Sequence, residues 1–212
     1  MEVVSIKVLC FHDGTYASNC YLAVSDDEQS AVVIDPSVSY DFVFRQRDKI
    51  PEIKKILLTH AHFDHVLYLD EWKEKTQASV CITKEDAPSL NDGEKNAYSF
   101  FFGESKTYGE ADELLSDGDI IHFGCEKLSL LHTPGHTCGS CCYIGDGIIF
   151  TGDTLFADGG VGRTDLYSGN SRELFSSLKR ILSLNKNYKI YPGHGADSTI
   201  EEEKLNHGFY AI

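Results

Sequence analysis

Short apolar runs separated by turn-forming residues mark the N-terminal part of the chain. Residues 4–8 alternate apolar and polar side chains with a period of two, which is typical of a half-buried strand. Apolar positions at helical spacing begin at Ser39 and end before Pro51, so a helix is predicted there. Residues 66–75 predict a second helix. Further strands are predicted at residues 21–24, 31–34, 53–58 and 79–82.

A long stretch without clear periodicity follows. Residues 84–119 are rich in Asp, Gly, Ser and Asn and contain the aromatic run Phe100-Phe101-Phe102. Such a stretch is typical of a binding loop or of a lid with short helices. The three phenylalanines are interpreted either as an anchor of this stretch on the core or as part of that loop.

The C-terminal part predicts two helices and five more strands. Residues 171–184 carry an apolar stripe at helical spacing that includes Phe175. Ser198 and Glu201 form a capping-box signature for a last helix. Strands are predicted at residues 119–123, 127–131, 142–144, 148–150 and 189–191. Mixed strands with helices in both halves predict a layered α/β domain in which helices cover two sheets.

Length and charge narrow the class of protein. The chain has 212 residues, and since domains typically run to about 100–200 residues, we expect a single domain over residues 1–212. There are 19 Lys and Arg against 33 Asp and Glu, a formal net charge of −14. This argues against nucleic acid as a partner, because affinity for phosphate backbones comes from surplus basic side chains. No membrane partner is expected either, because the apolar runs fall far short of the roughly 20 residues that span a bilayer.

The seven cysteines are an odd number and are spread along the chain. This favours free thiols in a reducing compartment over a disulfide framework. Because no signal-peptide pattern follows Glu2, we expect a cytoplasmic protein. Cys138 and Cys141 form a C-x-x-C pair, typical of zinc or redox sites, but no second pair follows it. Cys141 or Cys142 is interpreted instead as a small buried residue that opens a strand.

Histidines concentrate in one hexapeptide. His60-Ala61-His62-Phe63-Asp64-His65 contains four potential metal ligands in six residues, directly after a predicted strand. Zinc binds the nitrogen of His and the oxygen of Asp. Because a mononuclear centre rarely takes four ligands from one turn, the cluster predicts two metal ions.

Three further signals follow predicted strands. His136 lies in H-T-P-G-H-T, Asp153 in T-G-D-T, and His194 in P-G-H-G. A glycine precedes each of them and allows the backbone to turn sharply beyond the sheet edge. Loops at strand ends are the usual place for reacting groups, so these residues are candidates for the same site.

Taken in order, the motifs T-H-x-H-x-D-H, H-T-P-G-H-T, G-D-T-L-F and Y-P-G-H-G resemble the metallo-β-lactamase superfamily, from Asp35 to about Gly195. The resemblance implies a four-layer αββα sandwich with metals at the edge of the sheets. It implies that Asp35 orients a ligand histidine. It also implies a first metal held by His60, His62 and His136, a second held by Asp64, His65 and His194, and Asp153 as the bridge between them.

Within the superfamily, Gly162-Arg163-Thr164-Asp165 resembles the glyoxalase II-like branch, whose members hydrolyse thioesters such as S-lactoylglutathione. The chain ends about 17 residues after Gly195. It therefore resembles the short, single-domain members that lack the helical glutathione-binding extension. The glycine pair usual after the histidine cluster is replaced by Leu67-Tyr68, and these larger side chains are expected to reshape the pocket.

The leading hypothesis is a hydrolase of a small thioester or ester that uses two divalent metal ions. Zinc is the expected metal, with iron or manganese as alternatives because His/Asp sites select weakly. The ions would share a water that becomes hydroxide near neutral pH, and Asp64 would act as the catalytic residue that orients it. The substrate would be a small molecule.

The alternative is an oxidoreductase of the persulfide dioxygenase type, a related branch that also carries a G-R-T-D segment. There, His60, His136 and Asp153 would hold a single iron. The presence of His65 and His194 favours the hydrolase. The lack of an export signal argues against a β-lactamase, and the negative net charge argues against an RNA-processing nuclease. A non-catalytic module of the same fold is disfavoured because all seven expected metal ligands are present. His132 is not expected to be a ligand.

Overall fold

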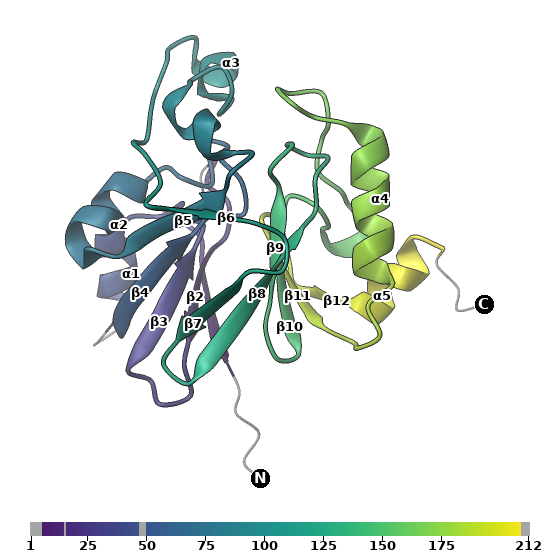
Figure 1. Cartoon of the computed structure of the whole chain (residues 1–212), viewed down its shortest axis with the longest axis horizontal. Coiled ribbons are helices and arrows are strands. Elements are labelled where there is room, and N and C mark those ends of the chain that lie inside the picture. The colour runs from purple at the N-terminus through teal and green to yellow at the C-terminus, as the bar shows by residue number, and fades with distance from the viewer. Residues whose placement is uncertain (1–5, 15, 47–49, 209–212) are drawn as a thin grey trace.

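Two mixed six-stranded sheets lie at the centre of the protein, seen in a computed structural model that describes residues 6–14, 16–46 and 50–208 (Figure 1). The first sheet contains, in order across it, β1 (Lys7–Phe11), β2 (Cys20–Val24), β3 (Ser30–Ile34), β4 (Glu52–Leu57), β5 (Ser79–Thr83) and β6 (Glu113–Leu115). Strands β1 to β3 pair antiparallel, and β3 to β6 pair parallel.

The second sheet is built from the C-terminal part of the chain. From one edge to the other it contains β12 (Ser198–Thr199), β11 (Lys189–Pro192), β10 (Ile148–Gly152), β9 (Cys141–Ile144), β8 (Glu126–His132) and β7 (Ile120–Phe123). Its pairs are antiparallel except for β10 and β11, which are parallel. Strands β8, β10 and β11 therefore point in the same direction.

Helices cover the outer face of each sheet (Figure 1). The first sheet is covered by α1 (Tyr40–Arg45) and α2 (Leu69–Thr76), and the second by α4 (Ser171–Leu182) and α5 (Ile200–Asn206). Three short helical segments, η1 (Ala87–Asn91), α3 (Tyr98–Phe102) and η2 (Ala157–Gly159), lie in connections. These layers form the αββα sandwich that the resemblance implies, so this prediction is confirmed. Within the described part of the chain, no helix is long and apolar enough to cross a bilayer.

Buried apolar side chains fill the spaces between the layers. Leu57 of the first sheet and Tyr143 and Phe150 of the second pack together between the sheets. Trp72 of α2 is fully buried against the first sheet, and its indole N–H donates a hydrogen bond to the carbonyl of Val38 at 2.8 Å. The sandwich is thus a rigid support for the loops at its edge.

Helix α4 spans Ser171–Leu182, two residues shorter than the predicted 171–184, and its apolar stripe is buried as predicted except at one position. It begins after Asn170, whose side-chain oxygen accepts hydrogen bonds from the N–H groups of Arg172 and Glu173. Phe175 is 54% exposed, so its assignment to the apolar stripe is wrong. Phe175 lies at the margin of the stripe, and its ring contacts the ammonium of Lys179, 4.4 Å from the ring centroid, instead of the core. The buried face consists of Leu174, Leu178, Ile181 and Leu182.

Several predicted element boundaries differ from those observed. Strand β1 spans Lys7–Phe11 rather than residues 4–8, of which Val4 and Ser5 lie outside the described residues. Helix α1 ends at Arg45, and residues 47–49 of the predicted helix also lie outside the described range.

Two further differences from the prediction are the start of α2 and the presence of an additional strand, β6. Helix α2 starts at Leu69 rather than at residue 66, because the preceding residues form consecutive turns. The three-residue strand β6 was not predicted, since it lies within the aperiodic stretch.

The start of α5 is shifted by one residue from the predicted capping box. Thr199 is the N-cap, and its hydroxyl accepts from the N–H of Glu202 at 3.2 Å. Ser198 lies in β12 instead, and its hydroxyl donates to the carboxylate of Glu203 at 2.6 Å. The prediction that Ser198 and Glu201 form a capping box is therefore wrong.

Candidate metal centre

The predicted ligands meet at one edge of the sandwich, in the loops that follow four strands. The hexapeptide that begins at His60 follows β4 in the first sheet. His136, Asp153 and His194 follow β8, β10 and β11 in the second sheet. Because these three strands point in the same direction, their ends bring the three residues to the same edge. All seven predicted side chains belong to three overlapping groups of potential metal ligands.

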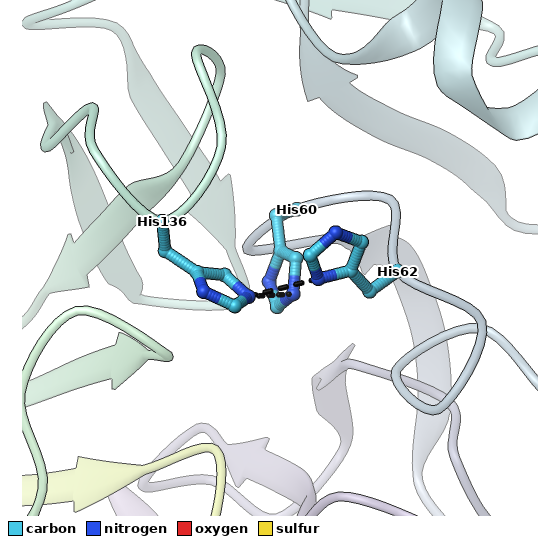
Figure 2. A group of neighbouring side chains, drawn as sticks. All are labelled: His60, His62 and His136. Carbon is cyan, nitrogen blue, oxygen red and sulfur yellow. Dashed lines mark hydrogen bonds between the residues drawn. The ribbon is translucent and has the colours of Figure 1, made fainter. Parts of the chain in front are cut away.

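The first group consists of three buried histidines from two loops (Figure 2). Nε2 of His136 lies 2.8 Å from Nδ1 of His62 and 3.2 Å from Nε2 of His60. Figure 2 shows the three rings turned toward one point. One ion at that point could accept a nitrogen from each ring.

The second group combines Asp64, His65 and His194. Oδ2 of Asp64 lies 3.2 Å from Nε2 of His194 and 3.9 Å from Nε2 of His65. His65 is fully buried, whereas His194 is partly exposed and closes the group on its outer side.

Asp153 lies between the two groups. Its Oδ1 is 3.1 Å from Nε2 of His65. Its Oδ2 is 3.6 Å from Nε2 of His136 and also 3.6 Å from Nε2 of His194. A single carboxylate therefore faces both groups, as a bridging ligand must.

The electrostatics of the centre suit metal binding. Burial, together with the neighbouring histidines, lowers the pKa of His60 well below its usual value, and burial and His136 lower the pKa of His62 to about 3. Both rings are therefore neutral at physiological pH, as metal ligands must be. Burial alone would lower the pKa of His65 and raise that of Asp153, but in the absence of a metal the neighbouring carboxylates keep His65 protonated, and its charge lowers the pKa of Asp153. A bound ion would take the place of that proton.

The side chains present fit two metal ions. The buried Nε2 of His65 and Oδ1 of Asp153 lie 3.1 Å apart, have no other hydrogen-bond partner among the described residues, and both face the centre. Histidine nitrogens and carboxylate oxygens are common zinc ligands, and a site with an open position is typical of a catalytic metal. The His/Asp clusters are thus consistent with a dinuclear centre.

Hydrogen bonds from outside the centre orient two of the rings. The carboxylate of Asp35 accepts from Nδ1 of His65 at 2.8 Å and from the N–H and hydroxyl of Thr59 at 2.8 and 2.7 Å. Nδ1 of His136 donates to the carbonyl of Arg163 at 2.7 Å. Since Nδ1 carries the proton in both rings, Nε2 is directed toward the centre. The hydrogen bond from His65 to Asp35 agrees with the orienting role that the resemblance implies for Asp35.

We expect Asp35→Asn to weaken metal binding at the second group by about 10–100-fold, the usual effect of changing a partner of a ligand histidine. The amide keeps the shape of the side chain but lacks the charge that makes His65 more basic. Competition with a chromophoric chelator measures this affinity. Unchanged binding at both groups would show that Asp35 has no part in orienting His65.

Close backbone approaches explain two of the glycines. A Cβ on Gly193 would lie 2.2 Å from Oδ1 of Asp153. Gly135 has a φ of 140°, and a Cβ there would lie 2.2 Å from the backbone nitrogen of Leu174. Any side chain at either position would displace a loop that carries a predicted ligand.

Two positioning residues have no signal in the sequence. The buried Asp86 accepts from the N–H of Ala61 and of Gly139 at 3.0 and 3.1 Å and from the hydroxyl of Thr137 at 2.9 Å. It therefore ties the loop of His60 to the loop of His136. As an isolated Asp in the aperiodic stretch, it gave no pattern to recognise.

Asn19 fixes the loop that carries His194. Its backbone N–H donates to the carbonyl of Gly193 at 2.7 Å, and its side-chain amide donates to the carbonyls of Pro192 and Gly195, both at 3.0 Å. Backbone carbonyls carry no sequence signature, so this contact could not be predicted.

A cavity of about 300 Å³ lies against the metal centre. Besides predicted ligands, four aromatic side chains line it: Tyr16, Phe63, Phe101 and Phe156. The residues of the run Phe100-Phe101-Phe102 are 66, 48 and 44% exposed, so their interpretation as a core anchor is wrong for Phe100 and holds only in part for the other two, which pack on the buried Phe63. They form α3, whose Phe101 and Phe102 rings lie 5.2 and 5.3 Å from the ring of Phe63.

The other candidate residues lie outside the centre. Nε2 of His132 is 3.0 Å from the carbonyl of Cys138, and His132 belongs to none of the three ligand groups. Cys138 and Cys141 are free thiols, as are the other cysteines, and none belongs to a ligand group found among the described residues. Cys141 and Cys142 are both buried in β9, as interpreted from the sequence.

Comparisons with known proteins agree with this geometry. The model of the Metallo-beta-lactamase superfamily matches residues 13–194, which include all seven predicted ligands. Hydroxyacylglutathione hydrolase GloC of Haemophilus influenzae is 31% identical over 221 residues, covering 99% of this chain and 98% of that protein.

Two solved structures share the fold over almost the whole chain. The B3 metallo-beta-lactamase BLEG-1 has a TM-score of 0.88 at 31% identity, covering 96% of this chain and 99% of that one. TTHA1623 in a di-iron-bound form has a TM-score of 0.77 at 31% identity, covering 98% of this chain and 100% of that one. The second of these holds two metal ions, the number that the clusters here suit.

Proposed function

Because this chain belongs to the metallo-beta-lactamase superfamily, we propose that it is a metal-dependent hydrolase of a small thioester or ester. The observation that carries the proposal is the pair of His/Asp groups, linked by Asp153, against a cavity of about 300 Å³. The likeness to GloC, a hydroxyacylglutathione hydrolase, supports a thioester as substrate.

In this proposal the two groups hold two metal ions, zinc first and iron or manganese as alternatives. When bound, the ions supply Lewis acidity, which lowers the pKa of a water and polarises the substrate carbonyl. His60, His62 and His136 would hold the first ion, Asp64, His65 and His194 would hold the second, and Asp153 faces both groups.

Asp64 is placed to orient the attacking water and to accept its proton. Its side chain lines the cavity. Burial raises its pKa, but the charge on His65 and the hydrogen bond from His194 outweigh burial and lower that pKa. The carboxylate is therefore ionised near neutral pH, which is the form that accepts a proton.

Water attacks the carbonyl directly. None of the described residues that line the cavity is a serine or a cysteine, so the mechanism needs no hydroxyl or thiol nucleophile from the chain there. Attack forms a C–O bond, the C–S bond of the thioester then breaks, and an acid and a thiol are released. The aromatic walls exclude bulk water and strengthen electrostatic interactions with the reacting carbonyl.

Metal analysis followed by a thioester assay tests the proposal. We expect two ions per chain in the purified protein and equimolar release of thiol and lactate from a lactoyl thioester. A single iron per chain, with oxygen uptake on glutathione persulfide, would replace the proposal by the dioxygenase alternative. Because of the likeness to BLEG-1, a chromogenic cephalosporin belongs in the same screen, and preferential turnover of it would reassign the substrate class.

A further inference from the structure

Among the described residues that line the cavity, one side chain other than the predicted metal ligands carries a positive charge. Apart from the predicted metal ligands, its lining is almost entirely aromatic, aliphatic or glycine, and Arg163 is the one basic side chain among the described residues that line it. The protein as a whole has a net charge of −14, which repels anions at long range. Besides the metal ions of the proposed centre, an anionic group that enters this cavity therefore has one positively charged partner among the described lining residues, Arg163.

The guanidinium of Arg163 is held in place on two sides. Its Nε and Nη2 donate to Oδ1 and Oδ2 of Asp165 at 2.6 and 2.7 Å. Its Cζ lies 5.6 Å from the ring centroid of Phe100 and 6.0 Å from that of Phe101, both on α3. Cation–π contacts of this kind orient a guanidinium over aromatic faces. The G-R-T-D segment and the exposed phenylalanine run thus act together.

Some N–H groups of the Arg163 guanidinium remain free to donate hydrogen bonds to a ligand. Arginine has five N–H donors in a planar fork, and Asp165 accepts two of them. The other three N–H groups make no hydrogen bond with any described residue. The side chain is 42% exposed at the rim of the cavity, so a ligand can reach the free edge without displacing Asp165.

We propose that Arg163 is a specificity-determining residue, whose free guanidinium edge binds a carboxylate that the substrate carries in addition to its scissile bond. This rests on the proposed function and names its substrate class: a small anionic thioester or ester with an apolar body. The apolar body lies against the aromatic walls. The volume of about 300 Å³ is at the lower end of small-molecule pockets, which hold about 300–1,000 Å³, so the substrate is small.

Matched pairs of synthetic thioesters test this. In the first pair, lactate is esterified to para-carboxybenzyl mercaptan or to its para-carbamoylbenzyl counterpart, which places the charge on the thiol half. In the second pair, para-carboxyphenylacetyl or para-carbamoylphenylacetyl is joined to ethanethiol, which places the charge on the acyl half. The members of each pair differ only in the charged group.

We expect the metal-loaded enzyme to prefer the carboxylate over the amide in one of the pairs, by about 10–100-fold in kcat/KM, because bidentate hydrogen bonds between charged groups are strong. Arg163→Gln should abolish the preference, so that kcat/KM for the carboxylate falls to the level of the amide. Arg163→Lys should keep only part of it, because an ammonium lacks the planar fork.

Arg172→Gln is the matched control, since it removes the same charge from an exposed position on α4 that does not line the cavity. It should keep the full preference. The metal content of each variant is measured in parallel, because the carbonyl of Arg163 also accepts a hydrogen bond from His136. Two ions per chain in Arg163→Gln would exclude a loss of metal as the cause.

The results of these assays distinguish a failure of the role of Arg163 from a failure of the proposed hydrolase activity. Hydrolysis of both members of each pair at equal rates would overturn the role of Arg163 and leave the hydrolase intact. If no thioester is cleaved, calorimetry with the uncleavable thioether analogues still tests the inference. A carboxylate preference in Kd that disappears in Arg163→Gln would support it, and equal Kd values would overturn it.

Discussion

Asp64→Asn should lower kcat for thioester hydrolysis by about 10²–10⁴-fold, the usual range for loss of a general base, while KM changes only a few-fold. Asparagine keeps the shape of the side chain and one oxygen near Nε2 of His194, which lies 3.2 Å from Oδ2 of Asp64. It cannot accept a proton from water. Because the pKa of Asp64 is lowered by His65 and His194 despite burial, the wild-type carboxylate is already ionised near neutral pH.

Steady-state kinetics with a lactoyl thioester, together with metal analysis of the same preparation, measures this effect. Cys138→Ala serves as the control, because Cys138 is half-buried in the loop after His136 and does not line the cavity. It should keep kcat within a few-fold. Near-normal turnover in Asp64→Asn, or an acyl group trapped on a cysteine, would contradict direct attack by water.

The second large effect concerns Asp153. Asp153→Ala should reduce metal content at both groups and abolish most activity, whereas His194→Ala should retain the ion of the first group. The reason is geometric: the Asp153 carboxylate lies 3.1 Å from His65 of one group and 3.6 Å from His136 of the other. His194 belongs only to the second group.

Elemental analysis after dialysis against a weak chelator distinguishes the two variants. We expect about one ion per chain in His194→Ala and fewer in Asp153→Ala. Asp146→Ala, which removes an exposed carboxylate paired with Lys186, should keep both ions. Two ions and normal turnover in Asp153→Ala would show that this residue does not bridge the metals.

Much of the fold is encoded in local patterns. Strands β2, β3 and β5 lie within one residue of their predicted ranges, because continuous apolar runs bounded by turn residues leave little freedom in where a buried strand begins. The failures have local causes as well. Phe175 lies at the margin of the buried face of α4 and contacts Lys179 instead of the core, and β6 has only three residues and no periodicity to reveal it.

The ligands of the candidate site, like much of the fold, are identified by local patterns in the sequence. The hexapeptide from His60 to His65 occupies a single turn, so its four ligands are close together by chain connectivity alone. His136, Asp153 and His194 were found because each follows a strand and a glycine. The structure brings all seven together, since the ends of β4, β8, β10 and β11 meet at one edge.

The sequence by itself determined the chemistry that is available, because residue type and spacing specify which nitrogen and oxygen ligands leave the sheet edge. Only the tertiary structure decided how these ligands are held and what they face. Asp86 joins two loops through backbone N–H groups, and Asn19 holds the His194 loop through backbone carbonyls. Arg163 reaches the cavity beside α3, a helix more than 60 residues away in the chain. Such contacts depend on backbone atoms common to every residue and on the packing of distant segments, and neither leaves a pattern in the order of the amino acids.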